Sequence, residues 1–300
     1  MSSTVTPLDS TTVAARLATD WGLRSVALTT HDGGMNSQTW FVGTEEARYV
    51  AKAVPVARRT SFEAGLAVAT IVEAAGIPAG APVPTSSGAL SVVIADQVLA
   101  LLRFVAGLAL EGESVEEREL IGTTLGRVHR ALAGHDLPGA APFPWLDPEA
   151  AHLTIRTWLR PAIEWALSAW RSIPPESLTR APLHTDPAPE AFRFDPTTST
   201  CGLIDWDLGV VGPLLYDLAS AEMYAGGPRF SGPLIEAYLA TGALARDEVA
   251  RGLPALVQLR WAVQADYFAR RIATDDLTGI DDRAENEKGL EDARRSLRGM

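Results

Sequence analysis

Apolar and polar residues alternate over the first third of the chain, in short runs that turn-like stretches separate. Alternation at a period of two predicts strands whose two faces meet different surroundings. A helical pattern precedes these runs, and a second interrupts them and ends at Gly76. The predicted elements are a helix at 11–20, strands at 25–30, 39–43 and 48–54, a helix at 59–75, and strands at 89–95 and 98–105. This order predicts a small antiparallel sheet with one main helix packed on it.

After residue 105 the pattern becomes mainly helical. Apolar residues recur at positions 121, 125, 128 and 132, which predicts a helix over 115–135, and residues 154–172 repeat the pattern. Two short strands interrupt the series, and further helices follow. We therefore predict an α+β protein with two lobes. Residues 1–103 form an N-lobe that carries the sheet, and residues 104–300 form a larger, mostly helical C-lobe.

Composition limits the partners of this chain. Its 300 residues include 26 basic and 37 acidic side chains, a net charge of −11, which argues against a nucleic-acid-binding face and against docking on anionic membranes. An acidic surface suits a cationic ligand. The single cysteine, Cys201, excludes an intrachain disulfide. The most apolar stretch is interrupted by Asp96 and Arg103, which argues against a membrane-spanning helix. With no signal-peptide pattern at its start, the chain is expected to be cytoplasmic, and its oligomeric state is left open.

One lysine stands out. Of the 26 basic residues only Lys52 and Lys288 are lysines, so the other 24 are arginines. Lys52 lies in the strand run "YVAKAV", with Val50 and Val54 at alternate positions. An inward-facing ammonium needs an anion, and Glu63 on the next helix could pair with it while the lysine holds phosphate oxygens. The alternative is a lysine on an exposed strand face.

A glycine pair precedes this lysine. Gly33 and Gly34 lie in "HDGGMNSQ", between two predicted strands. Without Cβ atoms, such residues let backbone N–H groups approach a polyphosphate. A simple hairpin turn explains them equally well.

Two acidic residues lie in the stretch that interrupts the helices. The loop "LHTDPAPEAF" contains His184 and Asp186, and Asp205 follows 19 residues later in "GLIDWD". Asp186 could accept or orient the proton of an attacking hydroxyl, with His184 bracing the loop backbone. Asp205 could bind Mg²⁺ that bridges nucleotide phosphates. Two alternatives stay open, namely ordinary acids at strand ends and a metal-dependent hydrolase built on these three residues, although the hydrolase leaves Lys52 unexplained.

Taken together, the order of these motifs resembles the aminoglycoside phosphotransferase and choline kinase-like family, from about residue 33 to 217. The catalytic stretch of that family reads H-G-D-x-x-x-x-N, then I-D-W or I-D-F, then a D-L-A segment. Here these appear as "HTDPAPEAF", "GLIDWD" and "GPLLYDLAS". The resemblance implies a two-lobed protein-kinase-like fold that uses ATP or GTP with Mg²⁺.

The resemblance assigns roles to residues of both lobes. Lys52 would hold nucleotide phosphates, with Glu63 as its partner. The segment from Arg103 to Val105 falls where the family's hinge meets adenine through backbone groups.

In the C-lobe, the resemblance assigns roles to four residues. Asp186 matches the catalytic Asp, in a loop that His184 braces, and Asp205 matches the metal-binding Asp. Asp217 matches an acid that supports the catalytic loop from below, a structural role.

This sequence departs from the pattern of the resembling family in the catalytic loop. Thr185 replaces the usual glycine, and Ala191 stands where the family has a metal-binding Asn. Alanine offers no oxygen ligand, so either Glu190 or Asp207 supplies a replacement, or one metal is held weakly, or transfer is inefficient.

We therefore predict a Mg²⁺-dependent phosphotransferase with an atypical catalytic loop, which moves a γ-phosphate to a hydroxyl of a small molecule such as an antibiotic or a metabolite. The alternative is a kinase-like protein that binds a nucleotide or a metabolite with little or no transfer.

Overall fold

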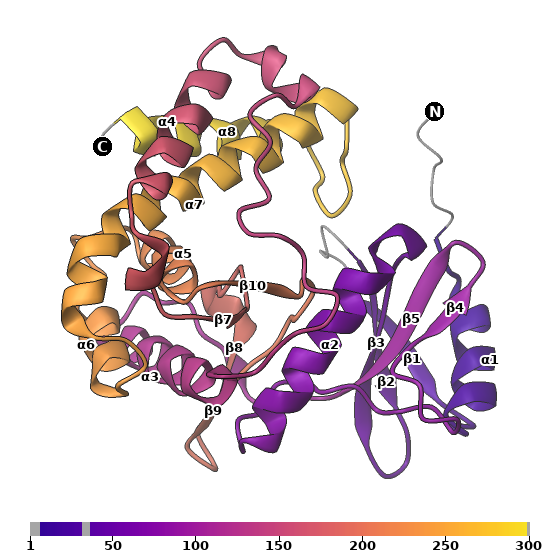
Figure 1. The fold of residues 1–300 in the computed structure, drawn as a ribbon. Coiled ribbons are helices and arrows are strands. Elements are labelled where there is room, and N and C mark those ends of the chain that lie inside the picture. Colours follow the sequence, from indigo (N-terminus) through magenta and orange to yellow (C-terminus); the bar gives the residue numbers. More distant parts are fainter. Residues whose placement is uncertain (1–6, 32–36, 299–300) are drawn as a thin grey trace.

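The structure, a computed structural model, describes residues 7–31 and 37–298. It has a smaller lobe built on a β-sheet and a larger lobe that is mostly helical (Figure 1). Within the described residues the sheet of the smaller lobe has five antiparallel strands, in the order β1-β2-β3-β5-β4. Their bounds are β1 Ala27–His31, β2 Gln38–Gly43, β3 Arg48–Pro55, β4 Val92–Ile94 and β5 Gln97–Arg103.

A helix covers each face of this sheet (Figure 1). Helix α1 (Ser10–Asp20) packs Val13 and Leu17 against one face, and helix α2 (Arg59–Ala74) packs Phe62 and Leu66 against the other. The central strands are buried on both faces, so both faces need an apolar cover. The helix predicted at 11–20 supplies the cover opposite α2.

The register of the sheet places Lys52 on the α2 side. Lys52 lies opposite Thr39 of β2 and Ala100 of β5. Because side chains alternate along a strand, Lys52 shares its face with Val54, which packs with residues of α2. Its neighbour Ala51 lies on the other face, in the cluster with α1.

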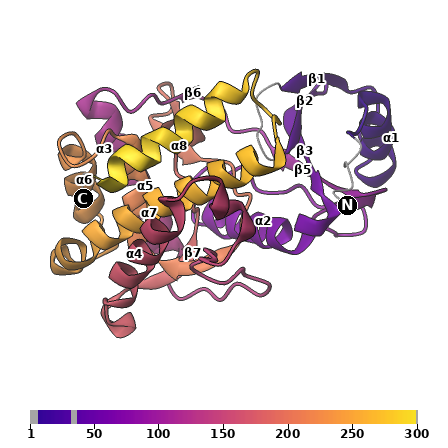
Figure 2. The same cartoon turned by 90° about the horizontal axis from the view of Figure 1, so that it is seen from above.

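The larger lobe is organised around one extensive core to which most of its helices contribute. The long helix α7 packs against α4, α5 and α8, and α3 packs against α6 (Figure 2). The bounds are α3 Val115–Leu132, α4 Leu159–Arg171, α5 Leu215–Tyr224, α6 Gly232–Ala240, α7 Arg246–Thr274 and α8 Arg283–Arg298. Short 3-10 helices span Val56–Arg58, Ala151–Ile155, Pro175–Ser177 and Pro189–Ala191.

Two small sheets position the segments that carry the candidate chemistry. One has the order β6-β8-β9, and the other pairs β7 with β10. Their bounds are β6 Leu108–Ala109, β7 Arg180–Leu183, β8 Phe192–Asp195, β9 Thr200–Leu203 and β10 Val210–Pro213. Strand β7 runs directly into His184, and β9 ends two residues before Asp205.

Helix α2 approaches the segment after β9 at van der Waals distance. A Cβ built on Gly65 would lie 2.2 Å from the carbonyl oxygen of Trp206, and one built on Gly209 would lie 2.3 Å from Cβ of Ala64. The amide of Gly209 also donates to the carbonyl of Ser61 at 3.0 Å. Only small residues permit this approach, which ties α2 of the smaller lobe to the 206–209 segment of the larger lobe.

The predicted α+β class and the two-lobed arrangement are confirmed. The main difference in an element is β4, predicted over 89–95 and observed only at Val92–Ile94. Its first residues instead close a turn, because the amide of Thr85 donates to the carbonyl of Ala89 at 2.8 Å. The sheet ends at Arg103, while the division into residues 1–103 and 104–300 stays a prediction. No helix within the described ranges is both long and apolar enough to cross a membrane.

Candidate active site

Lys52 is the centre of a charged cluster that joins the two lobes. Its ammonium forms ion pairs with the carboxylates of Asp205 and Asp207, both of which follow β9. The Lys52 side chain is only 9% exposed, whereas that of Asp205 is 57% exposed and that of Asp207 is 21% exposed. The predicted inward-facing lysine is thus present, and the anions beside it come from the larger lobe.

The charges of this cluster depend on one another. Burial alone would lower the pKa of Lys52, but the carboxylates of Asp207 and Asp205 outweigh burial and raise it. The Lys52 ammonium in turn lowers the pKa of the Asp205 carboxyl. Burial raises the pKa of Asp207, against the attraction of Lys52. Lys52 is therefore charged at neutral pH, and Asp205 is the more strongly ionised of the two acids.

Glu63, the expected partner of Lys52, is engaged elsewhere in this structure. Its carboxylate accepts from Ser91 Oγ at 2.6 Å and from Arg59 Nε at 3.0 Å. The close packing of α2 on the 206–209 segment explains the difference, because it brings Asp205 and Asp207 to the ammonium of Lys52. The expected pairing of Lys52 with Glu63 is therefore corrected to Asp205 and Asp207.

The backbone of the predicted catalytic loop is held by Asp217, near the start of α5. This fully buried carboxylate accepts from the amides of His184 and Thr185 at 2.7 and 2.8 Å, and from Nε2 of His129 at 3.1 Å. Thr185 has φ +76°, a conformation that is costly for a β-branched residue. The two hydrogen bonds to Asp217 hold the loop in that conformation, at the position where the resembling family has glycine.

His184 links this loop to the segment that carries the acids. Its Nε2 donates to the carbonyl of Ile204 at 2.8 Å, and its ring packs edge-on to Trp206 with centroids 4.7 Å apart. Asp205, between these two contacts, has φ +77°. The hydrogen bond is of the kind that the bracing role of His184 in the catalytic loop requires, and that role stays a prediction.

Asp186 contacts two side chains that none of the sequence motifs includes, Tyr224 and Arg260. Its Oδ1 accepts from Tyr224 Oη at 2.6 Å and from Arg260 Nη2 at 2.8 Å. The side chain of Arg260 is 7% exposed and that of Asp186 is 61% exposed. The sequence held one usable signal, since Arg260 interrupts the apolar run "ALVQLRWAV" much as Lys52 interrupts its strand. Tyr224 gave no such signal.

The position of the missing Asn is buried in the core of the larger lobe. Ala191 ends the 3-10 helix Pro189–Ala191, is 7% exposed, and its carbonyl accepts from the amide of Ile204 at 2.9 Å. This hydrogen bond places residue 191 beside the segment that carries Asp205. Glu190 is exposed, and its predicted role as a metal ligand stays a prediction.

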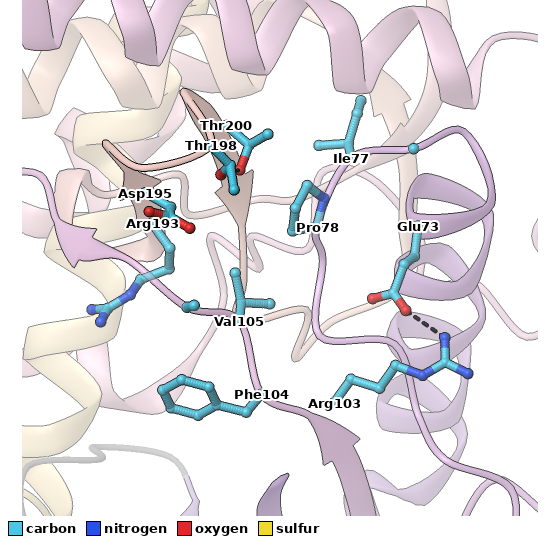
Figure 3. A pocket seen from close by; sticks show the side chains of 12 residues that line it. Glu73, Ile77, Pro78, Arg103, Phe104, Val105, Arg193, Asp195, Thr198 and Thr200 are labelled. Carbon is cyan, nitrogen blue, oxygen red and sulfur yellow. Dashed lines mark hydrogen bonds and ion pairs between the residues drawn. The ribbon is translucent and has the colours of Figure 1, made fainter. Parts of the chain in front are cut away.

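Residues 103–105, the predicted hinge, line a cavity of about 480 Å³ between the end of α2 and the β8–β9 hairpin (Figure 3). Arg103 Nη1 pairs with Glu73 at 2.6 Å, so its side chain braces the hinge against α2. Val105 also lines the cavity, whereas Lys52 and Asp186 do not. The predicted contact of residues 103–105 with adenine involves their backbone groups, so these side-chain contacts do not bear on it and it stays a prediction. Gly33 and Gly34, the predicted phosphate-binding glycines, lie outside the described residues.

The donor set at Lys52 suits a hard divalent cation. Asp205 and Asp207 direct two carboxylates to one point, and the ammonium they share marks a place where positive charge is favourable. Carboxylate oxygens are the ligands that Mg²⁺ prefers, and Mg²⁺ usually takes one or two of them together with waters and substrate phosphates. Over residues 7–31 and 37–298, no group of three or more His, Cys, Asp or Glu side chains is arranged to hold a metal ion by itself.

The small antiparallel sheet with its helices and the larger helical lobe together form a two-lobed, protein-kinase-like fold. A family model described as "Phosphotransferase enzyme family" matches residues 27–253. The chain belongs to this family. No curated protein matches it.

Solved structures with the same fold share little sequence with this chain. The complex of amicoumacin kinase hAmiN with AMP-PNP, Ca²⁺ and Ami is 14% identical, with a TM-score of 0.74, and the match covers 97% of this chain and 93% of that one. Spectinomycin phosphotransferase APH(9)-Ia, solved with ADP and spectinomycin, is 14% identical, with a TM-score of 0.64 and coverages of 96% and 95%. A microcompartment-associated aminopropanol kinase is 16% identical, with a TM-score of 0.68 and coverages of 96% and 95%. At these identities the likeness concerns the fold.

Proposed function

We propose that this protein transfers the γ-phosphoryl group of an adenine nucleotide to a hydroxyl of a small molecule in the cytoplasm. The observation that carries the proposal is the meeting of Lys52, from a strand of the smaller lobe, with Asp205 and Asp207, from the larger lobe. A buried cation beside two carboxylates supplies a contact for phosphate oxygens and ligands for Mg²⁺ in one place. Asp186, which is largely exposed and follows His184 by two residues, can receive a hydroxyl, and His184 ties this loop to Ile204, next to Asp205.

The structural neighbours support the choice of nucleotide and acceptor class. Two of them were solved with AMP-PNP or ADP, which favours an adenine nucleotide. Their names give two antibiotics and aminopropanol as the compounds that they bind or phosphorylate. We infer that the acceptor here is also a small molecule that carries a hydroxyl.

The residues of this chain would act mainly by positioning and by balancing charge. Lys52 would contact phosphate oxygens, and Asp205 and Asp207 would hold Mg²⁺, which would supply positive charge to balance the phosphates. Asp186 accepts a hydrogen bond from the acceptor hydroxyl and directs its oxygen towards the γ-phosphorus. The new P–O bond forms as the bond from the γ-phosphorus to the β–γ bridging oxygen breaks, which releases nucleoside diphosphate. The hydroxyl proton leaves through Asp186 to solvent.

A transfer assay beside a binding measurement tests the function. The protein is incubated with γ-³²P-labelled ATP and Mg²⁺ and with a panel of spectinomycin, amicoumacin, aminopropanol, sugars and homoserine, and labelled products are separated. ATP affinity is measured by calorimetry in parallel. Labelled acceptor is the expected result. ATP binding with no labelled product across the panel would instead favour a nucleotide-binding protein that does not transfer.

Asp205→Asn is expected to weaken Mg²⁺-dependent ATP binding by at least about tenfold, because it removes an anionic metal ligand. Asp207→Asn is expected to do the same, since its carboxylate meets the same ammonium as Asp205. Calorimetric titration of ATP at several Mg²⁺ concentrations measures both effects. Asp247→Asn, which changes an exposed acid paired with Arg251, is the matched control. Unchanged Mg²⁺ dependence in both site variants would exclude this pair as the metal site.

Ala191→Asn is expected to lower the Mg²⁺ concentration that gives half-maximal activity, because an amide oxygen would complete coordination that water otherwise supplies. We expect one well-held Mg²⁺ on Asp205, with Asp207 beside it, and a second that is weak or absent. Glu190→Ala is expected to change the Mg²⁺ requirement little. The measurement is a Mg²⁺ titration of the transfer rate at saturating ATP. If Glu190→Ala raised the requirement strongly and Ala191→Asn left it unchanged, Glu190 would be the ligand.

A further inference from the structure

We propose that Arg260 and Tyr224 are positioning residues that clamp one oxygen of Asp186, so that its other oxygen faces the acceptor hydroxyl in a fixed orientation. This inference rests on the proposed function, and it adds two residues of α5 and α7 to the machinery. Neither residue belongs to the motifs that carry the sequence resemblance.

The geometry of the clamp is a closed triangle of hydrogen bonds. Arg260 Nη2 and Tyr224 Oη donate to the same atom, Asp186 Oδ1, at 2.8 and 2.6 Å. Arg260 Nη2 also donates to Tyr224 Oη at 3.2 Å. Two donors on Oδ1 oppose rotation of the carboxylate about its last torsion, which would otherwise exchange its two oxygens. Oδ2 is left as the acceptor for another group.

The clamp is held by one face of α5. Asp217, Ser220 and Tyr224 are separated by three and four positions, so their side chains lie along the same side of the helix. Arg260 Nε donates to Ser220 Oγ at 2.9 Å, and Ser220 Oγ lies 3.5 Å from the carbonyl oxygen of Thr185. The face that holds the loop amides through Asp217 therefore also holds Arg260, and Arg260 holds the carboxylate.

The shape of the guanidinium matters as much as its charge. Arg260 uses Nε towards α5 and Nη2 towards Asp186, two donors at different positions of one rigid plane. A lysine has a single nitrogen and cannot reach both sites at once in this geometry. Among the ion pairs of the described residues, Asp186 is the carboxylate that Arg260 meets. A buried arginine beneath an exposed acid costs desolvation free energy, and orienting that acid gives the arginine a role that offsets this cost.

Loss of the clamp is expected to reduce turnover more than binding. Displacement of a reacting group by about 1 Å can lower a rate about 100-fold. We expect Arg260→Gln to reduce kcat for transfer about 10- to 100-fold with little change in KM for ATP. Tyr224→Phe removes one of the two donors, and we expect a loss of about 3- to 10-fold. Arg260→Lys keeps the positive charge but loses the planar guanidinium with its two separate donors. Its kcat is expected to fall between those of Arg260→Gln and the wild type.

The experiment measures kcat and KM for ATP with the acceptor found in the panel assay, and MgATP hydrolysis with water as the acceptor. Thermal melting and far-UV circular dichroism report the folded state of each variant. Arg271→Gln is the matched control, because Arg271 is a buried arginine on the same helix whose Nε donates to Asn286. It is expected to lower the melting temperature and to leave kcat unchanged at a temperature where all variants are folded.

The possible results distinguish a failure of the proposed phosphotransferase function from a failure of the clamp alone. A wild type that transfers to no acceptor and does not hydrolyse MgATP would remove the proposed function, and the clamp with it. An active wild type with Arg260→Gln and Tyr224→Phe at wild-type kcat would overturn the clamp alone. A kcat loss in Arg260→Gln that Arg271→Gln reproduces would show a structural effect and would also count against it. A graded kcat loss at constant KM, partly restored in Arg260→Lys, supports it.

Discussion

Replacement of Asp186 by asparagine is expected to reduce phosphoryl transfer about 10²- to 10⁴-fold, the range that a positioned proton acceptor usually contributes. The substituted amide keeps the shape of the side chain, and its oxygen can still accept from Tyr224. It lacks the negative charge that would attract the hydroxyl proton as the new P–O bond forms. Because this interaction acts mainly in the transition state, kcat should fall while ATP affinity is largely retained.

The fold should tolerate this change. The side chain of Asp186 is 61% exposed, so water can reach the altered pair with Arg260. The measurement is a comparison of kcat, ATP affinity and melting temperature between the wild type and Asp186→Asn. An active variant would remove Asp186 from the reaction. A variant that lost ATP binding as well would assign the residue to nucleotide binding.

Replacement of Lys52 by alanine is expected to impair nucleotide use far more than replacement of Lys288, and to lower kcat/KM for ATP by at least about 100-fold. Lys52 is buried between Asp205 and Asp207, whereas Lys288 lies exposed on α8. Since these are the two lysines of the chain, the pair gives a matched comparison of one change in two environments. ATP affinity and transfer rate are measured for both variants.

Loss of Lys52 should also destabilise the protein. The carboxylates of Asp205 and Asp207 would then lie close together without their cation, and like charges in a partly buried place repel. Added Mg²⁺ should therefore raise the melting temperature of Lys52→Ala, because the ion replaces the missing positive charge. Equal and negligible effects of the two lysine changes on binding and turnover would exclude Lys52 from the site.

The alternating pattern and the helical spacing were sufficient to predict the class of the fold and the order of its elements. The reason is that burial of a strand face or a helix face is a local property, which the periodicity of the sequence records directly. For the same reason Lys52 could be assigned to an inward-facing position, since it occurs in a strand whose alternate positions are apolar. The order of the motifs along the chain, from the glycine pair and Lys52 to the loop of His184 and Asp186 and the segment of Asp205, was likewise enough to indicate the family.

The partners of these residues were decided by tertiary structure. Lys52 meets Asp205, which is 153 positions away, because Gly65 and Ala64 let α2 pack directly on the segment after β9. The choice of Asp205 and Asp207 over Glu63 depends on that packing distance, which no local pattern records.

Tertiary packing also decided which side chains clamp Asp186. Arg260 lies 74 positions from Asp186 and meets it only because α5 and α7 pack together beneath the catalytic loop. The sequence by itself indicated which faces of the strands and helices are apolar and which elements carry the charged groups. The close packing of helices against loops decided which charges meet, because an ion pair between distant segments exists only once both segments are held at the same place.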